Sequence, residues 1–182
     1  MAKTIISKSD RIITLRYPRK TDLAILFDYI NGLGKEDTYI FINPDEPITY
    51  QEEREYLQSS LKKIQNKSQV TYLAFHEHQL IGIVDVKRLD RRQRHIGRFG
   101  ITLKPKYRHD GIGQQIVEYI IQEAKQSLGI KQVILEVFAN NKIAYKLYLK
   151  LGFQKYGRLP KGILYKGQYI DEILMCKLLA SA

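Results

Sequence analysis

The segment Arg108–Gly113 constrains the fold of this chain more than any other, because it joins a strand pattern to a long amphipathic helix pattern. The preceding residues, 99–105, form a mostly apolar run closed by Pro105, which is typical of a strand. The residues that follow repeat apolar side chains at helical spacing: Ile112, Ile116, Val117, Ile120, Ile121, Ala124 and Leu128. A strand–loop–helix unit of this kind turns the N–H groups at the start of its helix toward an anion. Gly111 and Gly113 have no Cβ and therefore allow a close approach of phosphate or a positive φ.

Two other nucleotide-binding loops are excluded at this segment. A P-loop ends in Gly-Lys-Ser or Gly-Lys-Thr, whereas Gly113 is followed by Gln114 and Gln115. A dinucleotide fingerprint needs three glycines, and only two are present. Taken alone, the loop is either a pyrophosphate cradle or a strand-to-helix turn that uses glycine for its geometry.

A second motif spans Asn141–Phe153 and follows the strand pattern of Val133–Phe138. Asn141 suits the N-cap of a helix, and Gly152 suits its C-terminal end. One face of this helix is apolar and is formed by Ala144, Leu147, Tyr148 and Leu151. The chain thus carries two motifs in order, each at the junction of a strand and a helix.

Together the two motifs resemble those of the GNAT superfamily of acyl-CoA N-acyltransferases. The first has the form Arg/Gln-x-x-Gly-x-Gly/Ala, matched here by Arg108, Gly111 and Gly113. The second reads approximately Asn-x-x-Ala-x-x-Leu-Tyr-x-Lys-x-Gly-Phe, and every fixed position is present in Asn141–Phe153. The pair of motifs is far more specific than the first motif alone.

One position departs from the pattern. Many members of the superfamily carry glycine directly after the arginine, where this chain has His109 followed by Asp110. A negative charge beside a pyrophosphate site is unfavourable. We therefore expect the Asp110 carboxylate to cap the helix, so that only its backbone faces the phosphates.

The resemblance implies an α/β fold with a GNAT-like mixed, mostly antiparallel central sheet of about seven strands flanked by about four helices. The residue patterns predict strands over residues 11–16, 70–76, 80–88, 96–103, 133–138, 153–165 and 168–178, and helices over residues 21–33, 49–65, 111–128 and 142–151. Thr49 and Glu52 form a capping-box signature at the start of the second helix. No shift in composition marks a boundary, so residues 1–182 are expected to form a single N-acetyltransferase domain.

Composition limits the class of protein further. A hydrophobic content of 44% in 182 residues favours a folded core over disorder. The absence of an 18-residue apolar run and of a signal-peptide pattern favours a soluble, cytoplasmic protein without a membrane partner. The single cysteine, Cys176, is expected to be a buried structural residue, and four scattered histidines predict no metal site.

The net charge of +11 is unevenly distributed. Residues 1–60 hold 8 basic and 10 acidic side chains, whereas the remainder holds 22 basic and 9 acidic ones. The basic part contains both motifs and would attract the phosphates of coenzyme A, and the acidic part would attract a cationic amine. The densest basic run, Arg88–His95, is either a solvated loop or a site for RNA, an acidic protein or the cofactor's outer phosphate. No RNA-recognition motif accompanies it, so a nucleic-acid partner is not favoured.

The reaction implied by the resemblance is acetyl transfer from acetyl-CoA to a primary amine by direct attack in a ternary complex. Ile101, Thr102 and Leu103 would lie along the pantetheine arm, where a backbone N–H polarises the thioester carbonyl. Asn141 would contact the pantetheine or orient the thioester besides capping its helix. The pyrophosphate would be held by the loop residues Arg108, His109, Asp110, Gly111, Ile112, Gly113 and Gln114.

The resemblance also assigns the proton transfers. Tyr148 matches the family's usual donor to the departing thiolate, because a phenol donates while it remains neutral at pH 7. A core tyrosine would give the same pattern. The group that accepts the amine proton is Glu136 or Asp85, each of which alternates with apolar residues in a strand pattern, or an ordered water.

The acceptor and the oligomeric state stay open at this point. The closing segment Gly167–Met175 resembles a GNAT subgroup that includes ribosomal-protein N-terminal and spermidine acetyltransferases, and substrate choice is expected to depend on residues 31–47. A homodimer is an open alternative to a monomer. Two rival functions remain: a catalytically silent GNAT-fold module that binds acyl-CoA, and a basic RNA- or ribosome-binding protein.

Overall fold

A central sheet organises the protein, which we describe from a computed structural model covering residues 2–36 and 38–180. The described residues form eight strands in the spatial order β1-β2-β3-β4-β5-β6-β8-β7. The strands are β1 (Lys3–Ile6), β2 (Ile12–Arg16), β3 (Gln69–His76), β4 (Gln79–Arg88), β5 (Ile96–Leu103), β6 (Gln132–Phe138), β7 (Gln154–Tyr165) and β8 (Gln168–Leu178). Among them, β5 and β6 form the one parallel pair, and all other neighbours are antiparallel.

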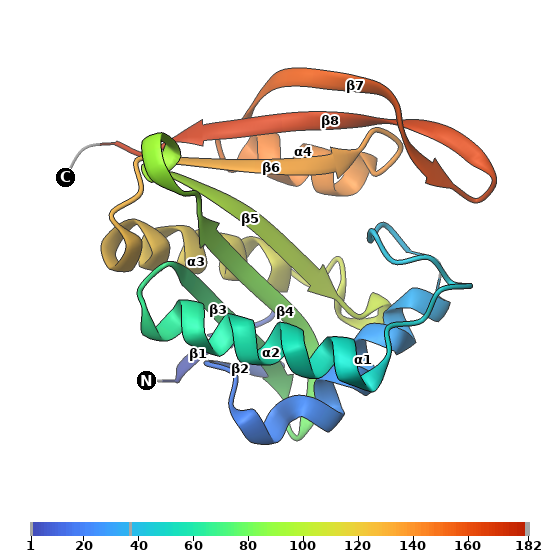
Figure 1. Ribbon diagram of the computed structural model, residues 1–182, viewed down its shortest axis with the longest axis vertical. Helices are drawn as coiled ribbons and strands as arrows, with labels where there is room; N and C mark the ends of the chain where they lie inside the picture. The colour runs from blue at the N-terminus through green and yellow to red at the C-terminus, as the bar shows by residue number, and fades with distance from the viewer. Residues whose placement is uncertain (1, 37, 181–182) are drawn as a thin grey trace.

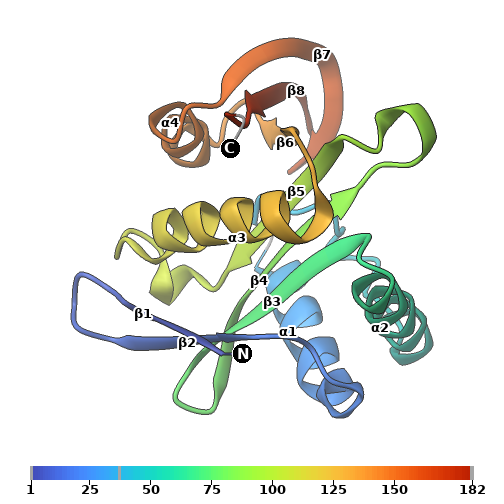
Figure 2. The same ribbon diagram turned by 90° about the vertical axis from the view of Figure 1, so that its left-hand side faces the viewer.

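Helices cover both faces of the sheet. The α-helices are α1 (Leu23–Lys35), α2 (Tyr50–Gln65), α3 (Ile112–Leu128) and α4 (Lys142–Lys150), and short 3-10 helices occupy Lys20–Asp22, Arg91–Gln93 and Pro105–Tyr107. Helices α1 and α2 lie on one face, and α3 and α4 lie on the other (Figure 2). Each face has its own apolar core, a small one under α1 and α2 and a large one under α3. No described helix combines the length and apolarity that crossing a bilayer requires.

The mixed, mostly antiparallel sheet predicted from the sequence is confirmed, with one strand more than expected. The additional strand is β1, which pairs with β2 through Lys3 and Leu15. It was missed because it has four residues and buries one of them, Ile5, so it shows almost no alternation. The capping box is confirmed: Thr49 Oγ1 accepts a hydrogen bond from the Glu52 backbone N–H, and the Glu52 carboxylate accepts one from the Thr49 N–H.

The parallel pair β5–β6 is short, and this shapes the middle of the sheet. Pairing runs only from Ile96–Arg98 of β5 to Gln132–Ile134 of β6. Beyond these residues the two strands diverge, each staying with its other neighbour, β4 or β8 (Figure 1). We call the diverging segments, Phe99–Leu103 and Leu135–Phe138, the fork. Their facing backbone edges are not paired with each other in the described sheet.

Candidate active site

The predicted phosphate loop, Arg108–Gly113, lies between the end of β5 and the start of α3. Gly111 is the N-cap residue of α3 and has a φ of 76°, a conformation that favours glycine. A Cβ on Gly113 would lie 3.5 Å from Leu103 Cδ1 and 3.8 Å from Leu147 Cδ2. The loop, the end of β5 and α4 therefore converge at this glycine.

The prediction that the Asp110 carboxylate caps α3 is wrong. Its Oδ1 accepts a hydrogen bond from the Ser9 backbone N–H at 2.9 Å, and its Oδ2 accepts one from the Ser9 hydroxyl at 2.6 Å. Arg11 forms an ion pair with the same carboxylate at 3.5 Å. The hydrogen bonds from Ser9 hold the pKa of Asp110 below its usual value. The negative charge is thus satisfied away from α3, and no described side chain caps the start of that helix.

An uncapped helix start of this kind suits an anion. The first N–H groups of an α-helix lack intrahelical partners, and the helix dipole favours negative charge there. Ile112 is itself fully buried, so it offers the loop its backbone only. Gln114 lies in the first turn of α3, where its side-chain oxygen accepts a hydrogen bond from Lys150 Nζ of α4 at 2.9 Å. His109, within the loop, has a φ of 64° and is exposed.

The backbone of β5 presents polar groups to the fork. The Ile96 carbonyl accepts a hydrogen bond from the Leu89 N–H, and the Lys104 N–H donates one to the Ile81 carbonyl. The even-numbered residues of β5 therefore direct their backbone N–H and C=O groups toward β4. Ile101 and Leu103, which alternate with them, direct theirs toward the fork. Arg108 Nε donates to the Leu103 carbonyl at 2.9 Å, so this arginine ties the loop to the strand end.

The Thr102 side chain projects from the face of the sheet that α1 covers. Its hydroxyl lies 3.0 Å from the hydroxyl of Tyr29, a buried residue of α1. Burial raises the pKa of Tyr29, so the phenol stays protonated. Sequence reasoning missed Tyr29, because its spacing from Leu26 and Leu33 predicts only an apolar helix face.

Asn141 and Tyr148 occupy the start and the buried face of α4. Asn141 Oδ1 accepts a hydrogen bond from the Ala144 N–H at 3.1 Å, which confirms the predicted cap and uses only the oxygen of the amide. The Tyr148 ring packs edge-on against Phe99 and Phe153, with centroid distances of 6.0 and 5.7 Å. Burial raises the pKa of Tyr148, which keeps its hydroxyl a proton donor at neutral pH.

The two candidate bases, Glu136 and Asp85, project from the same face of the sheet. Glu136 of β6 forms an ion pair with Arg98 of β5 at 3.3 Å. Asp85 of β4 lies opposite Gly100, two residues beyond Arg98, and pairs with Lys87 at 3.3 Å. Burial raises the pKa of Asp85 despite that lysine. The two carboxylates thus lie on either side of β5: Glu136 belongs to the β6 segment of the fork, and Asp85 lies on β4 opposite the β5 segment.

Aromatic side chains from distant segments meet at the end of β6. Phe138 packs against Tyr39, Phe41 and Tyr165, and Tyr39 stacks on Tyr165 with a centroid distance of 5.3 Å. We call these four residues the aromatic cluster. Glu172 lies directly opposite Phe138 in β8, and burial together with the charge of Glu136 raises its pKa. The cluster joins the α1–α2 connection, in which substrate choice was predicted to lie, to the β7–β8 hairpin.

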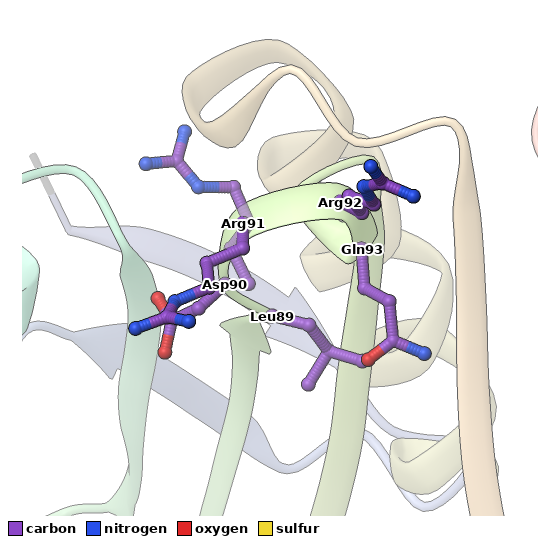
Figure 3. A pocket seen from close by; sticks show the side chains of 6 residues that line it. Leu89, Asp90, Arg91, Arg92 and Gln93 are labelled. Carbon is purple, nitrogen blue, oxygen red and sulfur yellow. The ribbon is translucent and has the colours of Figure 1, made fainter.

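The basic run Arg88–His95 lies at the opposite end of β5 from the phosphate loop. Arg88–Gln93 line an open depression of about 820 Å³, and Arg91 and Arg92 extend to different sides of the loop (Figure 3). The eight residues of β5 separate the depression from the phosphate loop by roughly 23 Å, at about 3.3 Å per residue. This separation argues against the alternative that the run binds the cofactor's outer phosphate.

Within residues 2–36 and 38–180, no group of three or more His, Cys, Asp or Glu side chains is arranged to hold a metal ion. Cys176 lies in β8 and is only partly buried, whereas the sequence predicted a buried cysteine.

Comparison with known proteins identifies the family. The model of the Acetyltransferase (GNAT) family matches residues 35–153, and the chain belongs to this family. The crystal structure of a GNAT-family acetyltransferase from Streptococcus pneumoniae superposes with a TM-score of 0.82 at 29% identity, over 92% of this chain and 99% of that one. A putative acetyltransferase from Salmonella typhimurium, solved with its cofactor acetyl-CoA, has the same fold, with a TM-score of 0.78 at 16% identity over 93% and 95% of the two chains.

Curated relatives are acetyltransferases with different acceptors. The L-amino acid N-acetyltransferase AaaT of Escherichia coli K12 is 30% identical over 52% of this chain and 57% of its own length. Spermidine N(1)-acetyltransferase of the same organism is 25% identical over 63% of this chain and 61% of its own. The [Ribosomal protein bS18]-alanine N-acetyltransferase of that organism is 37% identical over 31% and 38%. The chain therefore spans less than two thirds of the length of these three relatives, and it belongs to a family of acetyltransferases.

Proposed function

We propose that residues 1–182 form a single N-acetyltransferase domain that moves the acetyl group from acetyl-CoA to a primary amine by direct attack in a ternary complex. The observation that carries this proposal is the fork beside the uncapped start of α3. A diverging strand pair offers backbone groups for an extended, amide-containing arm, and the helix start offers N–H groups for phosphates. Acetyl-CoA has both parts and supplies the activated acetyl thioester.

The residues of the fork and the phosphate loop fit this cosubstrate. Gly111, at the N-cap of α3, has the positive φ that this turn requires and leaves out a Cβ that would meet Lys8, and Asp110 turns its charge toward Ser9. We assign the pyrophosphate to the N–H groups of Gly111–Gln114 and the pantetheine amides to the backbone of Ile101 and Leu103. Asn141, whose NH2 group is not used by its cap, donates to the same arm.

Tyr148 is assigned as the proton donor to the leaving sulfur. Burial against Phe99 and Phe153 keeps the phenol neutral and orients it from α4. The proton of the attacking amine goes to Glu136, because this carboxylate lies on β6 in the part of the strand that has left β5. Asp85 lies opposite Gly100 in the neighbouring strand β4 and is the alternative group to accept this proton.

The proposed acceptor is a primary amine that is cationic in solution. Glu136 and Glu172 lie on the face of the sheet beside the aromatic cluster, where a carboxylate can attract a cation. A lysine-like amine has a pKa of about 10.4, so only one part in a few thousand is neutral at pH 7, whereas a peptide α-amine with a pKa of about 8 needs far less assistance. The relatives described above are named for L-amino acids, spermidine and an alanine of a ribosomal protein, all of which fit an amine acceptor.

The test is release of CoA thiol from acetyl-CoA in the presence of three amine classes: L-amino acids, spermidine and a peptide that begins with alanine. We expect one class to accelerate thiol release well above the amine-free rate. Binding of acetyl-CoA without acceleration by any amine would instead support the acyl-CoA-binding module. Failure to bind acetyl-CoA, together with salt-sensitive binding of RNA, would support the nucleic-acid alternative.

A further inference from the structure

The turn between β1 and β2, Ser7–Arg11, is fastened to the phosphate loop by its backbone. The Lys8 N–H donates to the Asp110 carbonyl at 3.0 Å, and Ser9 holds the Asp110 carboxylate. Arg11 reaches the Lys106 carbonyl at 3.3 Å, just before the loop. This turn therefore forms one wall of the loop.

Gln115 of α3 adds a further tie. Its Nε2 donates to the Ile6 carbonyl of β1 at 2.8 Å. The first turn of α3 and the N-terminal hairpin are thus joined on both sides of the loop.

The side chain of Lys8 lies along Gly111. A Cβ added to Gly111 would be 3.2 Å from Lys8 Cγ, 3.6 Å from Cδ and 3.4 Å from Cε. Three successive methylenes therefore follow the N-cap residue of α3, and the ammonium is one bond beyond the last of them. Lys8 is exposed and has no ion pair within the described part of the chain.

The neighbouring carboxylate does not compete for this ammonium. Asp110 is already bonded to Ser9 and paired with Arg11. The Lys8 ammonium adds positive charge beside a helix start that already favours an anion.

We propose that Lys8 is a cofactor-binding residue whose ammonium binds the pyrophosphate of coenzyme A at the start of α3. The inference rests on the proposed cofactor site. Lys8 lies outside residues 35–153, the range matched by the family model, so the contact belongs to the N-terminal hairpin of this chain. It was not visible in the sequence, because the hairpin and the loop are about 100 residues apart, as with Ser9 and Asp110 at a separation of 101.

The test is the Kd of CoA and of 3′-dephospho-CoA, measured by titration calorimetry for wild type, Lys8→Met, Lys8→Arg and Lys62→Met. Methionine keeps the methylene contact with Gly111 and removes only the charge. Lys62 is an exposed lysine of α2, on the opposite face of the sheet, and controls for the change in net charge. The unliganded melting temperature of each variant checks that it folds.

We expect Lys8→Met to weaken both ligands by the same factor, roughly tenfold, or about 1.4 kcal/mol. Lys8→Arg should restore most of the affinity, and Lys62→Met should change it less than twofold. Equal effects of Lys8→Met and Lys62→Met would overturn the proposal. A loss confined to CoA would overturn it too, because Lys8 would then bind the 3′-phosphate. Absence of binding in wild type would refute the proposed function itself, and the Lys8 contact with it.

Discussion

Tyr148 is the residue at which packing and chemistry are hardest to separate, since a buried tyrosine between Phe99 and Phe153 serves either purpose. Tyr148→Phe keeps the ring contacts and removes the hydroxyl. We expect the rate of acetyl transfer to fall by about 100-fold, the lower end of general acid catalysis, while the Kd of acetyl-CoA stays within about twofold. Single-turnover rates and calorimetry measure the two quantities. An unchanged rate would reduce Tyr148 to a core residue.

Glu136 and Asp85 can be separated by matched isosteric variants. If Glu136 accepts the amine proton, Glu136→Gln should lower kcat/KM by about 100-fold, and Asp85→Asn should lower it by less than tenfold. The loss should shrink as the pH is raised toward the pKa of the amine, because more of the acceptor is then already neutral. The reverse order of the two variants would assign the role to Asp85. Equal small losses would assign it to water.

At the scale of single elements, α2 contains a buried carboxylate whose ionisation costs stability. Glu53 is 6% exposed, and burial raises its pKa to about 7. In the unfolded chain the pKa of this carboxyl is the ordinary value of about 4.3. The stability that the protonated carboxyl allows is therefore complete below about pH 4.3 and falls as the pH rises to about 7.

Glu53→Gln should therefore raise the free energy of unfolding at pH 8 by at least about 1 kcal/mol, and by less at pH 5. Urea unfolding at the two pH values measures this difference. Glu55→Gln, at an exposed position of the same helix, is the control and should show no comparable gain. An equal effect of Glu53→Gln at both pH values would contradict the assigned ionisation.

Elements whose signals are local were predictable from the sequence. The Thr49–Glu52 capping box, the glycine before α3 and the Asn141 cap each depend on residues a few positions apart, and all three are in the predicted places. The carboxylate of Asp110 was misassigned because its partner, Ser9, is 101 residues away. The aromatic cluster and Tyr29 were missed for the same reason: only the fold brings their partners together.

On the scale of the whole molecule, basic side chains are concentrated in the part of the chain that carries the two cofactor motifs, whereas residues 1–60 are slightly acidic. Residues 61–182 carry both motifs and 22 basic against 9 acidic side chains. We expect the Kd of acetyl-CoA to rise several-fold between about 50 mM and 500 mM NaCl, because salt screens the attraction of the phosphates. Calorimetry at the two concentrations measures this change, and a constant Kd would show that the field of the molecule contributes little.

The central claim is that the start of α3 beside the fork holds acetyl-CoA. The test is the Tm of wild type, Gly111→Glu and Gly129→Glu, each measured by thermal unfolding with and without about 0.5 mM acetyl-CoA. Gly129 is the matched control: it ends the same helix with a φ of 65°, and a Cβ there would meet nothing within 4 Å. Both variants thus add the same charge and a similar backbone strain.

At about 100 times its Kd the ligand adds about 2.7 kcal/mol, which raises Tm by roughly 5–10 °C in a chain of this size. We predict that rise in wild type and in Gly129→Glu, and its loss in Gly111→Glu, where the new carboxylate occupies the anion site. A rise that survives in Gly111→Glu, or no rise in folded wild type, would contradict the account.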